Sequence, residues 1–261
     1  MSTSKPVIVL IPGAFHRPSV WNGVVERLRS QGFTALTPPL AVCGDLTASS
    51  AGAKEWKDLA DKGPVDDAKL IHDQLLPLLD EGKEAIVVSH SYGSVPACVA
   101  IEGQTTLDRA AKGLKGGIRA VINIAGFASP VRGKSLMGTD DEPPLMPYHV
   151  LEEGVLHLQD DAKPLWYSDL SPEARDAAWN DLHMTQSRKA FLLFPQFIES
   201  DIKVPKTYVF TENDEAVSPA YQEMFITTGA YDNVVRVPSG HTPALSMPDK
   251  VVEIIVNAAQ T

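Results

Sequence analysis

Short apolar runs alternate with stretches of helical periodicity along most of this chain. The runs are rich in Val and Ile, as is typical of strands buried on both faces of a parallel sheet. They lie at residues 6–11, 33–37, 85–88, 118–125, 206–211 and 233–237. Apolar residues that recur every three or four positions predict helices over residues 21–28, 66–79, 95–101, 219–227 and 248–259. Strands that alternate with helices predict a mostly parallel sheet with helices on both faces.

This alternation is interrupted between about residues 130 and 200. The stretch is at first proline-rich and then has helical patterns over residues 171–182 and 187–194. The first of these begins with Ser171 and Pro172, a favourable N-cap followed by a favourable first helical residue. We therefore predict a single α/β domain over residues 1–261, with an inserted helical cap at about 130–200.

Composition narrows the possible partners. A net charge of -10 argues against nucleic acid and against an anionic membrane surface, because both attract clustered Lys and Arg. Cys43 and Cys98 are the only cysteines, and neither their number nor their spacing indicates a metal site. We expect a reduced, cytoplasmic protein without disulfides, cofactor or metal, and leave open whether it is a monomer or a homodimer.

The segment from Glu84 to Ala97 contains the first candidate chemistry. An apolar strand ends in Ser89-His90-Ser91-Tyr92-Gly93, and a helix of small residues follows. A strand, a tight turn with serine at its apex and a helix form a nucleophile elbow, which lifts the Ser91 hydroxyl clear of the sheet. The usual pattern is G-x-S-x-G, so Ser89 stands where glycine is common. An ordinary Ser/Gly turn is the alternative, and partner residues must decide between the two.

Two later loops offer the partners that a serine nucleophile needs. Serine requires a base to take its proton, and a histidine base requires a carboxylate to orient it. In one class of serine hydrolases the acid and then the histidine follow the nucleophile along the chain, each after a late strand. Asp214 and His241 occupy those places. Glu212 and Glu215 are alternatives for the acid, but the shorter side chain of Asp214 suits a rigid hold on the histidine.

An oxyanion hole needs two backbone N–H donors. The residue after the nucleophile, Tyr92, is expected to give one. The loop after the first strand is expected to give the other, since Gly13 allows a turn that presents the N–H of Ala14. A plain strand-ending turn at Pro12-Gly13 is the alternative. All these pieces follow strand ends in the right order, which favours the catalytic interpretation.

These motifs resemble those of the α/β-hydrolase superfamily. The likeness rests on Pro12 to His16, Ser89 to Gly93, Thr211 to Asp214, and Gly240-His241, and covers nearly the whole chain. It is strongest to small esterases of the methyl-salicylate esterase and hydroxynitrile lyase type and to their fungal and bacterial relatives. The resemblance implies Ser91 as nucleophile, Asp214 as acid, His241 as base, and Ala14 with Tyr92 as oxyanion donors. Departures at Ser89 and Pro12 remove no catalytic group.

The leading hypothesis is a serine hydrolase that cleaves a small carboxylic ester, lactone or thioester through an acyl-enzyme on Ser91. Aromatic side chains suggest an apolar pocket, although ordinary packing of the cap on the core is the alternative for each of them. The candidate substrate-binding residues are Phe15, His16, Phe127, Trp166 and Tyr167. A lyase acting with the same three groups is a rival, but such lyases have a lysine next to the histidine, where this chain has Thr242. A non-catalytic small-molecule-binding protein on this fold is the second rival.

Overall fold

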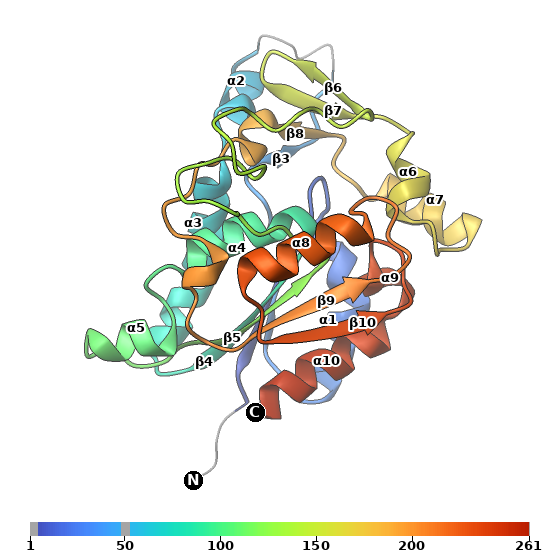
Figure 1. Ribbon diagram of the computed structural model, residues 1–261. Coiled ribbons are helices and arrows are strands. Elements are labelled where there is room, and N and C mark those ends of the chain that lie inside the picture. The colour runs from blue at the N-terminus through green and yellow to red at the C-terminus, as the bar shows by residue number, and fades with distance from the viewer. Residues whose placement is uncertain (1–4, 48–52, 261) are drawn as a thin grey trace.

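A six-stranded parallel sheet forms the centre of the molecule (Figure 1). The structure, a computed structural model, describes residues 5–47 and 53–260. The strand order is β10-β9-β5-β4-β1-β2, and every pair is parallel. The strands are β1 (Val7–Ile11), β2 (Ala35–Leu36), β4 (Glu84–His90), β5 (Gly117–Ile124), β9 (Lys206–Thr211) and β10 (Asn233–Val237). The predicted parallel sheet is therefore confirmed.

Helices cover both faces of this sheet, as the alternating pattern predicts. The helices α1 (Asn22–Ser30) and α10 (Pro248–Gln260) pack together on one face, with α9 (Pro243–Ser246) beside them. The other face carries α3 (Pro64–Asp80), α4 (Ser94–Ile101) and α8 (Pro219–Gly229). Short helices α2 (Lys54–Ala60) and α5 (Thr106–Ala111) lie at the periphery (Figure 1).

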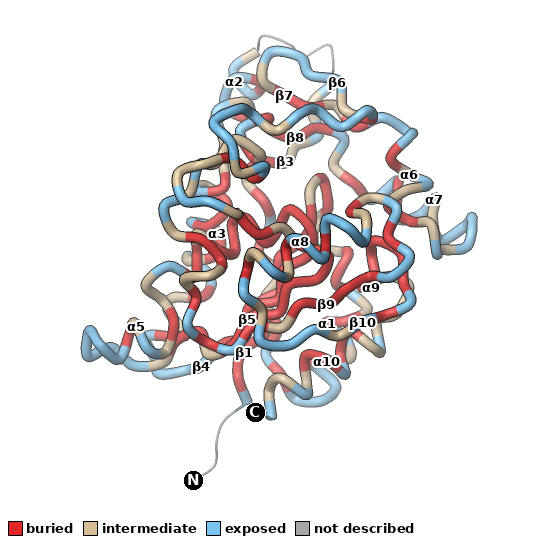
Figure 2. The backbone as a smooth tube through the Cα atoms, in the orientation of Figure 1, coloured by how far each residue is buried: buried red, intermediate tan, exposed pale blue. Residues whose placement is uncertain are grey.

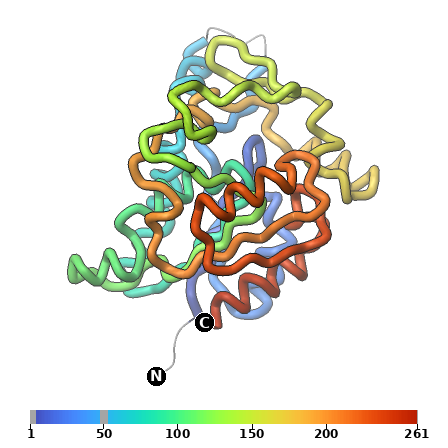
Figure 3. The backbone as a smooth tube through the Cα atoms, in the orientation of Figure 1, coloured from blue at the N-terminus to red at the C-terminus, as the bar shows by residue number. Residues whose placement is uncertain are grey.

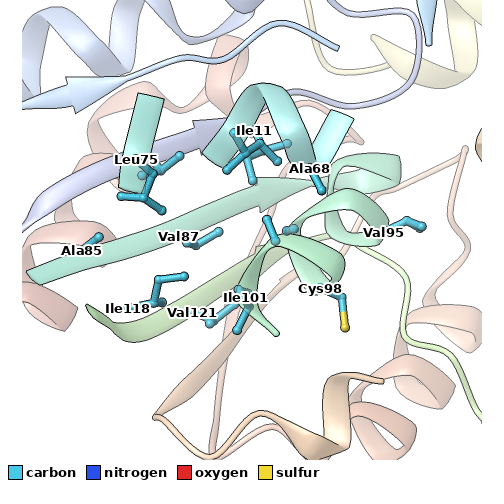
Figure 4. Close-up of a cluster of buried hydrophobic side chains, with 14 of the residues drawn as sticks. Ile11, Ala68, Leu75, Ala85, Val87, Val95, Cys98, Ile101, Ile118 and Val121 are labelled. Carbon is cyan, nitrogen blue, oxygen red and sulfur yellow. The ribbon is translucent and has the colours of Figure 1, made fainter. Parts of the chain in front are cut away.

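The central strands are buried on both faces, so their side chains pack in two separate apolar clusters, one on each face of the sheet. All five residues of β1 are buried, and buried segments concentrate along the strands while outer helix faces are exposed (Figure 2). In one cluster Val87 of β4 and Val121 of β5 pack with Leu75 of α3 and Ile101 of α4, and Ile101 lies next to Val121 (Figure 4). Small side chains on α4 allow this helix to lie close against the sheet directly after the elbow.

The predicted cap region forms a second, antiparallel sheet of order β3-β8-β7-β6, in which β3 comes from the first part of the chain, outside residues 130–200. Its strands are β3 (Cys43–Gly44), β6 (His149–Glu152), β7 (Val155–Leu158) and β8 (Thr185–Ser187), and two helices join it, α6 (Ala162–Trp166) and α7 (Pro172–Asn180). The end of α10 lies at the opposite end of the molecule from β6 and β7 (Figure 3). The predicted cap is thus mixed, not purely helical.

The helix predicted over residues 187–194 is wrong, whereas the one predicted over 171–182 corresponds to α7. Residues 185–187 form β8, and a single 3₁₀ turn, η4 (Arg188–Phe191), follows. The Ser187 hydroxyl donates to the carbonyl of Ala60 and accepts from the N–H of Lys189, so this segment is fixed by distant partners and a local cap. These bonds outweigh the helical spacing of its apolar residues.

Candidate active site

The turn after β4 has the strained geometry of a nucleophile elbow. Ser91 adopts a φ of 50°, in the left-handed region that non-glycine residues rarely occupy. It opens a short 3₁₀ turn (Ser91–Gly93) that leads directly into α4. Such strain persists where the surrounding structure enforces it, and it is characteristic of functional sites. Here the elbow is enforced by the close approach of β1.

Ser89 is accommodated where glycine is usual in this motif because its hydroxyl has a buried partner. The Ser89 Oγ donates to Oδ1 of Asn123 on β5, at 2.9 Å. The amide nitrogen of Asn123 donates in turn to the Tyr231 hydroxyl at 2.6 Å and to the Phe127 carbonyl at 3.3 Å. All polar atoms of this chain of bonds are therefore satisfied behind the elbow.

Gly93 is required by packing, and its replacement gives a testable prediction. A Cβ at this position would lie 2.5 Å from the carbonyl oxygen of Pro12 and 2.8 Å from that of Ile11. Both are backbone atoms, so Gly93→Ala should push β1 away from the elbow. We expect the melting temperature to fall by about 2–12 °C, the effect of about 1–3 kcal/mol of overpacking in a chain of this size.

Gly23→Ala is the matched control for Gly93→Ala. Gly23 lies in α1, where an added Cβ would meet its nearest atom, a guanidinium nitrogen of Arg27, at 3.5 Å. Helix propensity then makes the substitution neutral or stabilising. Thermal denaturation of both variants is the measurement, and a Gly93→Ala protein as stable as Gly23→Ala would contradict the close approach.

Asp214 and His241 form a buried pair at the ends of β9 and β10. The Nδ1 of His241 donates to Oδ2 of Asp214 at 2.8 Å. The same carboxylate accepts the N–H groups of Ala216 and Val217 at Oδ1, and the Thr211 hydroxyl at Oδ2, each at 2.8 Å. Burial alone would raise the pKa of Asp214, but the His241 charge and these hydrogen bonds hold it below its ordinary value. The carboxylate is therefore ionised and fixed in direction.

The loop that carries His241 is held by its neighbours on both sides. His90, the residue before Ser91, donates from Nε2 to the His241 carbonyl at 2.8 Å. From the cap, Asp169 accepts the N–H of Gly240 at 2.7 Å, and the Trp166 carbonyl accepts the Thr242 hydroxyl at 3.0 Å. In the neutral form of His241, with Nδ1–H committed to Asp214, Nε2 is the proton acceptor.

Ser91, His241, Ala14 and Tyr92 line one cavity, so the structure brings these predicted residues together. Among the described residues none hydrogen-bonds to the Ser91 Oγ in this resting state, and none accepts the N–H of Ala14. Hydrogen bonds between a nucleophile and its base are often long before substrate binds, and tighten afterwards. An unpartnered backbone N–H beside a serine is the arrangement that an oxyanion requires.

Both proposed oxyanion donors are anchored by buried side chains that the sequence did not single out. Phe15, which follows Ala14, has a φ of 60°, and its N–H donates to Oε1 of Gln186 at 2.8 Å. The Tyr92 hydroxyl donates to Asp67 on α3 at 2.6 Å. Asp67 is fully buried, and burial raises its pKa to about 7 despite this bond.

A model of the family described as "Alpha/beta hydrolase family" matches residues 8–254. The chain belongs to the alpha/beta hydrolase family. The alpha/beta hydrolase nvfD of Aspergillus novofumigatus is 29% identical over 262 residues, covering 98% of this chain and 97% of that protein. Two solved structures share the fold. The pyrethroid hydrolase PytH has a TM-score of 0.72 and 19% sequence identity, and the match covers 99% of this chain and 98% of that one. Polyneuridine aldehyde esterase has a TM-score of 0.74 and 14% sequence identity, and the match covers 98% of this chain and 100% of that one.

The cavity of this alpha/beta hydrolase has a volume of about 250 Å³ and lies between the sheet and the cap. Its walls are mostly apolar. The apolar lining includes Phe127, Leu136, Met146, Trp166, Phe191 and Phe225. Phe127 and Trp166 thus lie where the sequence placed candidate substrate contacts.

Three other candidate contacts, Phe15, His16 and Tyr167, do not line this cavity; they pack behind its wall. His16 donates from Nδ1 to the Ala14 carbonyl at 2.8 Å, accepts the Tyr167 hydroxyl at Nε2 at 2.9 Å, and stacks on Trp166. Burial lowers the pKa of His16 to about 4, so the ring is neutral. The sequence analysis proposed these three residues as substrate contacts, whereas their hydrogen bonds and packing support the Ala14 loop.

The described part of the chain contains no group of three His, Cys, Asp or Glu side chains placed to hold a metal ion. Cys43 and Cys98 are free thiols. No helix within residues 5–47 and 53–260 is long and apolar enough to cross a membrane.

Proposed function

We propose that this protein is a serine hydrolase that cleaves a carboxylic ester, lactone or thioester through an acyl-enzyme on Ser91. One observation carries the proposal. An ionised, immobilised Asp214 holds His241 in the tautomer that accepts a proton, on the same cavity as a serine in a strained elbow. Membership of the alpha/beta hydrolase family supports hydrolysis as the reaction class.

In the first half of the reaction the Ser91 Oγ bonds to the carbonyl carbon while its proton passes to Nε2 of His241. The carbonyl oxygen becomes an oxyanion and accepts the N–H groups of Ala14 and Tyr92. The bond from carbon to the leaving oxygen then breaks, and His241 returns the proton to that oxygen. The alcohol departs, and the acyl group remains on Ser91.

Water completes the second half by the same route. It gives a proton to His241 as its oxygen attacks the acyl carbon, and the second oxyanion uses the same two N–H donors. The bond to Ser91 breaks, and the serine oxygen recovers the proton from His241. The carboxylic acid is released and the enzyme returns to its starting state.

The cavity favours a small, largely apolar or aromatic substrate. Its volume of about 250 Å³ and its aromatic lining suit one ring or a short chain on either side of the scissile bond. Thr242 bonds to a backbone carbonyl of the cap at the place next to His241. Thr242 carries no cationic group, so this position favours ester hydrolysis over a lyase reaction.

Labelling with a fluorophosphonate tests the proposed nucleophile. We expect one covalent adduct by intact mass, located on Ser91 by peptide mapping, together with turnover of short-chain p-nitrophenyl esters. Heat-unfolded protein is the control, because a serine without its base should not react. An absent adduct on folded protein, with no ester turnover, would overturn the proposal and favour a ligand-binding role. Cleavage of hydroxynitriles without ester turnover would favour a lyase.

A further inference from the structure

Arg188 is an unusual member of the cavity wall. Among the described residues that line the cavity it is the one with a permanent charge, while most of the others are apolar. It follows β8 directly and begins the η4 turn, and only 8% of the residue is exposed. Burying a guanidinium is costly unless its donors are paired, so its presence here calls for an acceptor.

The protein itself supplies few acceptors for this guanidinium. Its Nη2 donates to the carbonyl of Pro143 and lies 3.7 Å from a carboxylate oxygen of Glu142, a side chain that is 65% exposed. Among the described residues no acceptor pairs with its Nε or Nη1. Arginine has five N–H donors in a planar fork, and most of this fork therefore has no partner within the described chain.

A second polar group on the same wall also lacks a partner. His149, at the start of β6, lines the cavity, and its Nε2 is buried without a hydrogen-bond partner. Burial and, to a smaller extent, the Arg188 charge lower the pKa of His149 to about 4. The ring is therefore neutral at pH 7 and adds no charge. Its Nε2 is enclosed by the protein, whereas its Nδ1 is neither enclosed nor hydrogen-bonded to a described residue, so Nδ1 is the atom that can meet a ligand in the cavity.

We propose that Arg188 and His149 form a subsite that binds a carboxylate of the substrate, so that the preferred substrate is an ester or lactone bearing a free acid group. This inference rests on the proposed function. A carboxylate matches the planar fork of arginine with two parallel hydrogen bonds. Among the described residues, Arg188 supplies the one permanent positive charge of this wall, and the Glu142 carboxylate near it is largely exposed to solvent, so the subsite fits a singly charged carboxylate better than a dianionic phosphate. The apolar remainder of the cavity takes the carbon skeleton of the same molecule.

Two matched pairs of esters test this subsite. Mono-p-nitrophenyl adipate and p-nitrophenyl hexanoate differ by a carboxylate on the acyl side, and 4-acetoxybenzoate and 4-acetoxybenzamide differ by one on the alcohol side. In at least one pair we expect kcat/KM to favour the anion by about 10- to 100-fold, the usual value of a charge-assisted hydrogen bond. Arg188→Gln should abolish that preference, so that the ratio of kcat/KM for the anionic ester to kcat/KM for the neutral ester falls to about 1.

Lys189→Gln is the matched control. Lys189 is the next residue, its side chain is 53% exposed, and it pairs with Asp61 on the surface, so the variant removes the same charge outside the cavity. The Lys189→Gln variant should prefer the anionic ester by the same factor as the wild-type protein. Since Arg188 also bonds the Pro143 carbonyl, each variant is checked by circular dichroism. Arg188→Lys is the second variant; it keeps the charge without the fork and should retain only part of the preference.

A binding measurement separates this inference from the proposed function. Calorimetry compares 4-hydroxybenzoate with 4-hydroxybenzamide on wild-type protein and on Arg188→Gln. If wild-type protein binds the benzoate more tightly than the benzamide, and Arg188→Gln loses this difference, the subsite is supported even if no ester is hydrolysed. Ester hydrolysis without preference for either anion, together with equal binding of benzoate and benzamide, would overturn the subsite and leave the hydrolase intact. If Lys189→Gln removed the preference for the anion as fully as Arg188→Gln does, the subsite would also be overturned, because the preference would then arise from the overall charge of the protein.

Discussion

Replacing Ser91 with alanine should lower kcat/KM for an ester substrate by about 10⁴-fold or more, because the reaction then loses its covalent route. The change removes only the hydroxyl. Alanine carries the same Cβ as serine, so the strained φ of 50° costs no more than before. Among the described residues none bonds to this hydroxyl in the resting state, and the melting temperature should stay within about 2 °C of the wild-type value.

The measurement for Ser91→Ala combines steady-state ester hydrolysis with thermal denaturation of the same sample. The oxyanion donors and the cavity remain, so slow residual turnover above the rate in water is expected. A variant that keeps more than about 1% of wild-type activity while folded would identify a different nucleophile. A variant that is inactive because it has unfolded would instead be recognised from its melting curve.

The sheet and the candidate triad were predictable because their signals are local in sequence. Each buried strand is a short run of β-branched residues, and each candidate group follows such a run. Parallel strands bring their carboxyl ends to one edge, so Ser91, Asp214 and His241 needed no long-range information to be placed together. The choice of Asp214 over its acidic neighbours followed from its shorter side chain, and that side chain does contact His241.

The supporting shell was not predictable, because its contacts depend on tertiary packing. Gln186 reaches the N–H of Phe15 across 171 positions of sequence, and Asp67 reaches Tyr92 across 25. Glutamine and aspartate are common on surfaces, and nothing in their local sequence marks them as buried. The partners of Gln186 and Asp67 become evident only when β8 and α3 are placed next to the Ala14 loop and the elbow.

The β6–β7 hairpin of the cap is a different case, since a local signal was present. Two residues, Glu153 and Gly154, connect the strands, and both have a positive φ, of 44° and 82°. This is the backbone of a tight two-residue hairpin turn, for which a glycine is a typical marker. A glutamate in its first position weakened the signal, because side chains other than Asn, Asp and Gly are uncommon there.

Changing Asp214 to asparagine should reduce kcat by about 10⁴-fold with little change in fold. The N–H groups of Ala216 and Val217 both donate to Oδ1 and will select the amide oxygen for that place. The NH₂ group must then face Nδ1 of His241, where Oδ2 now accepts a proton. Thr211 tolerates this exchange, because its hydroxyl also contacts Oε1 of Gln222 at 3.1 Å.

This orientation forces His241 into the wrong tautomer. Facing an NH₂ donor, Nδ1 must be the acceptor, so the ring proton moves to Nε2, which can no longer take the proton of Ser91. Fluorophosphonate labelling should slow together with ester hydrolysis, since both need the same proton transfer. Glu212→Gln and Glu215→Gln remove the same charge from exposed neighbours and are the matched controls. If either control lost activity while Asp214→Asn stayed within about tenfold of wild type, that glutamate would be the acid and the contact at 2.8 Å would have another purpose.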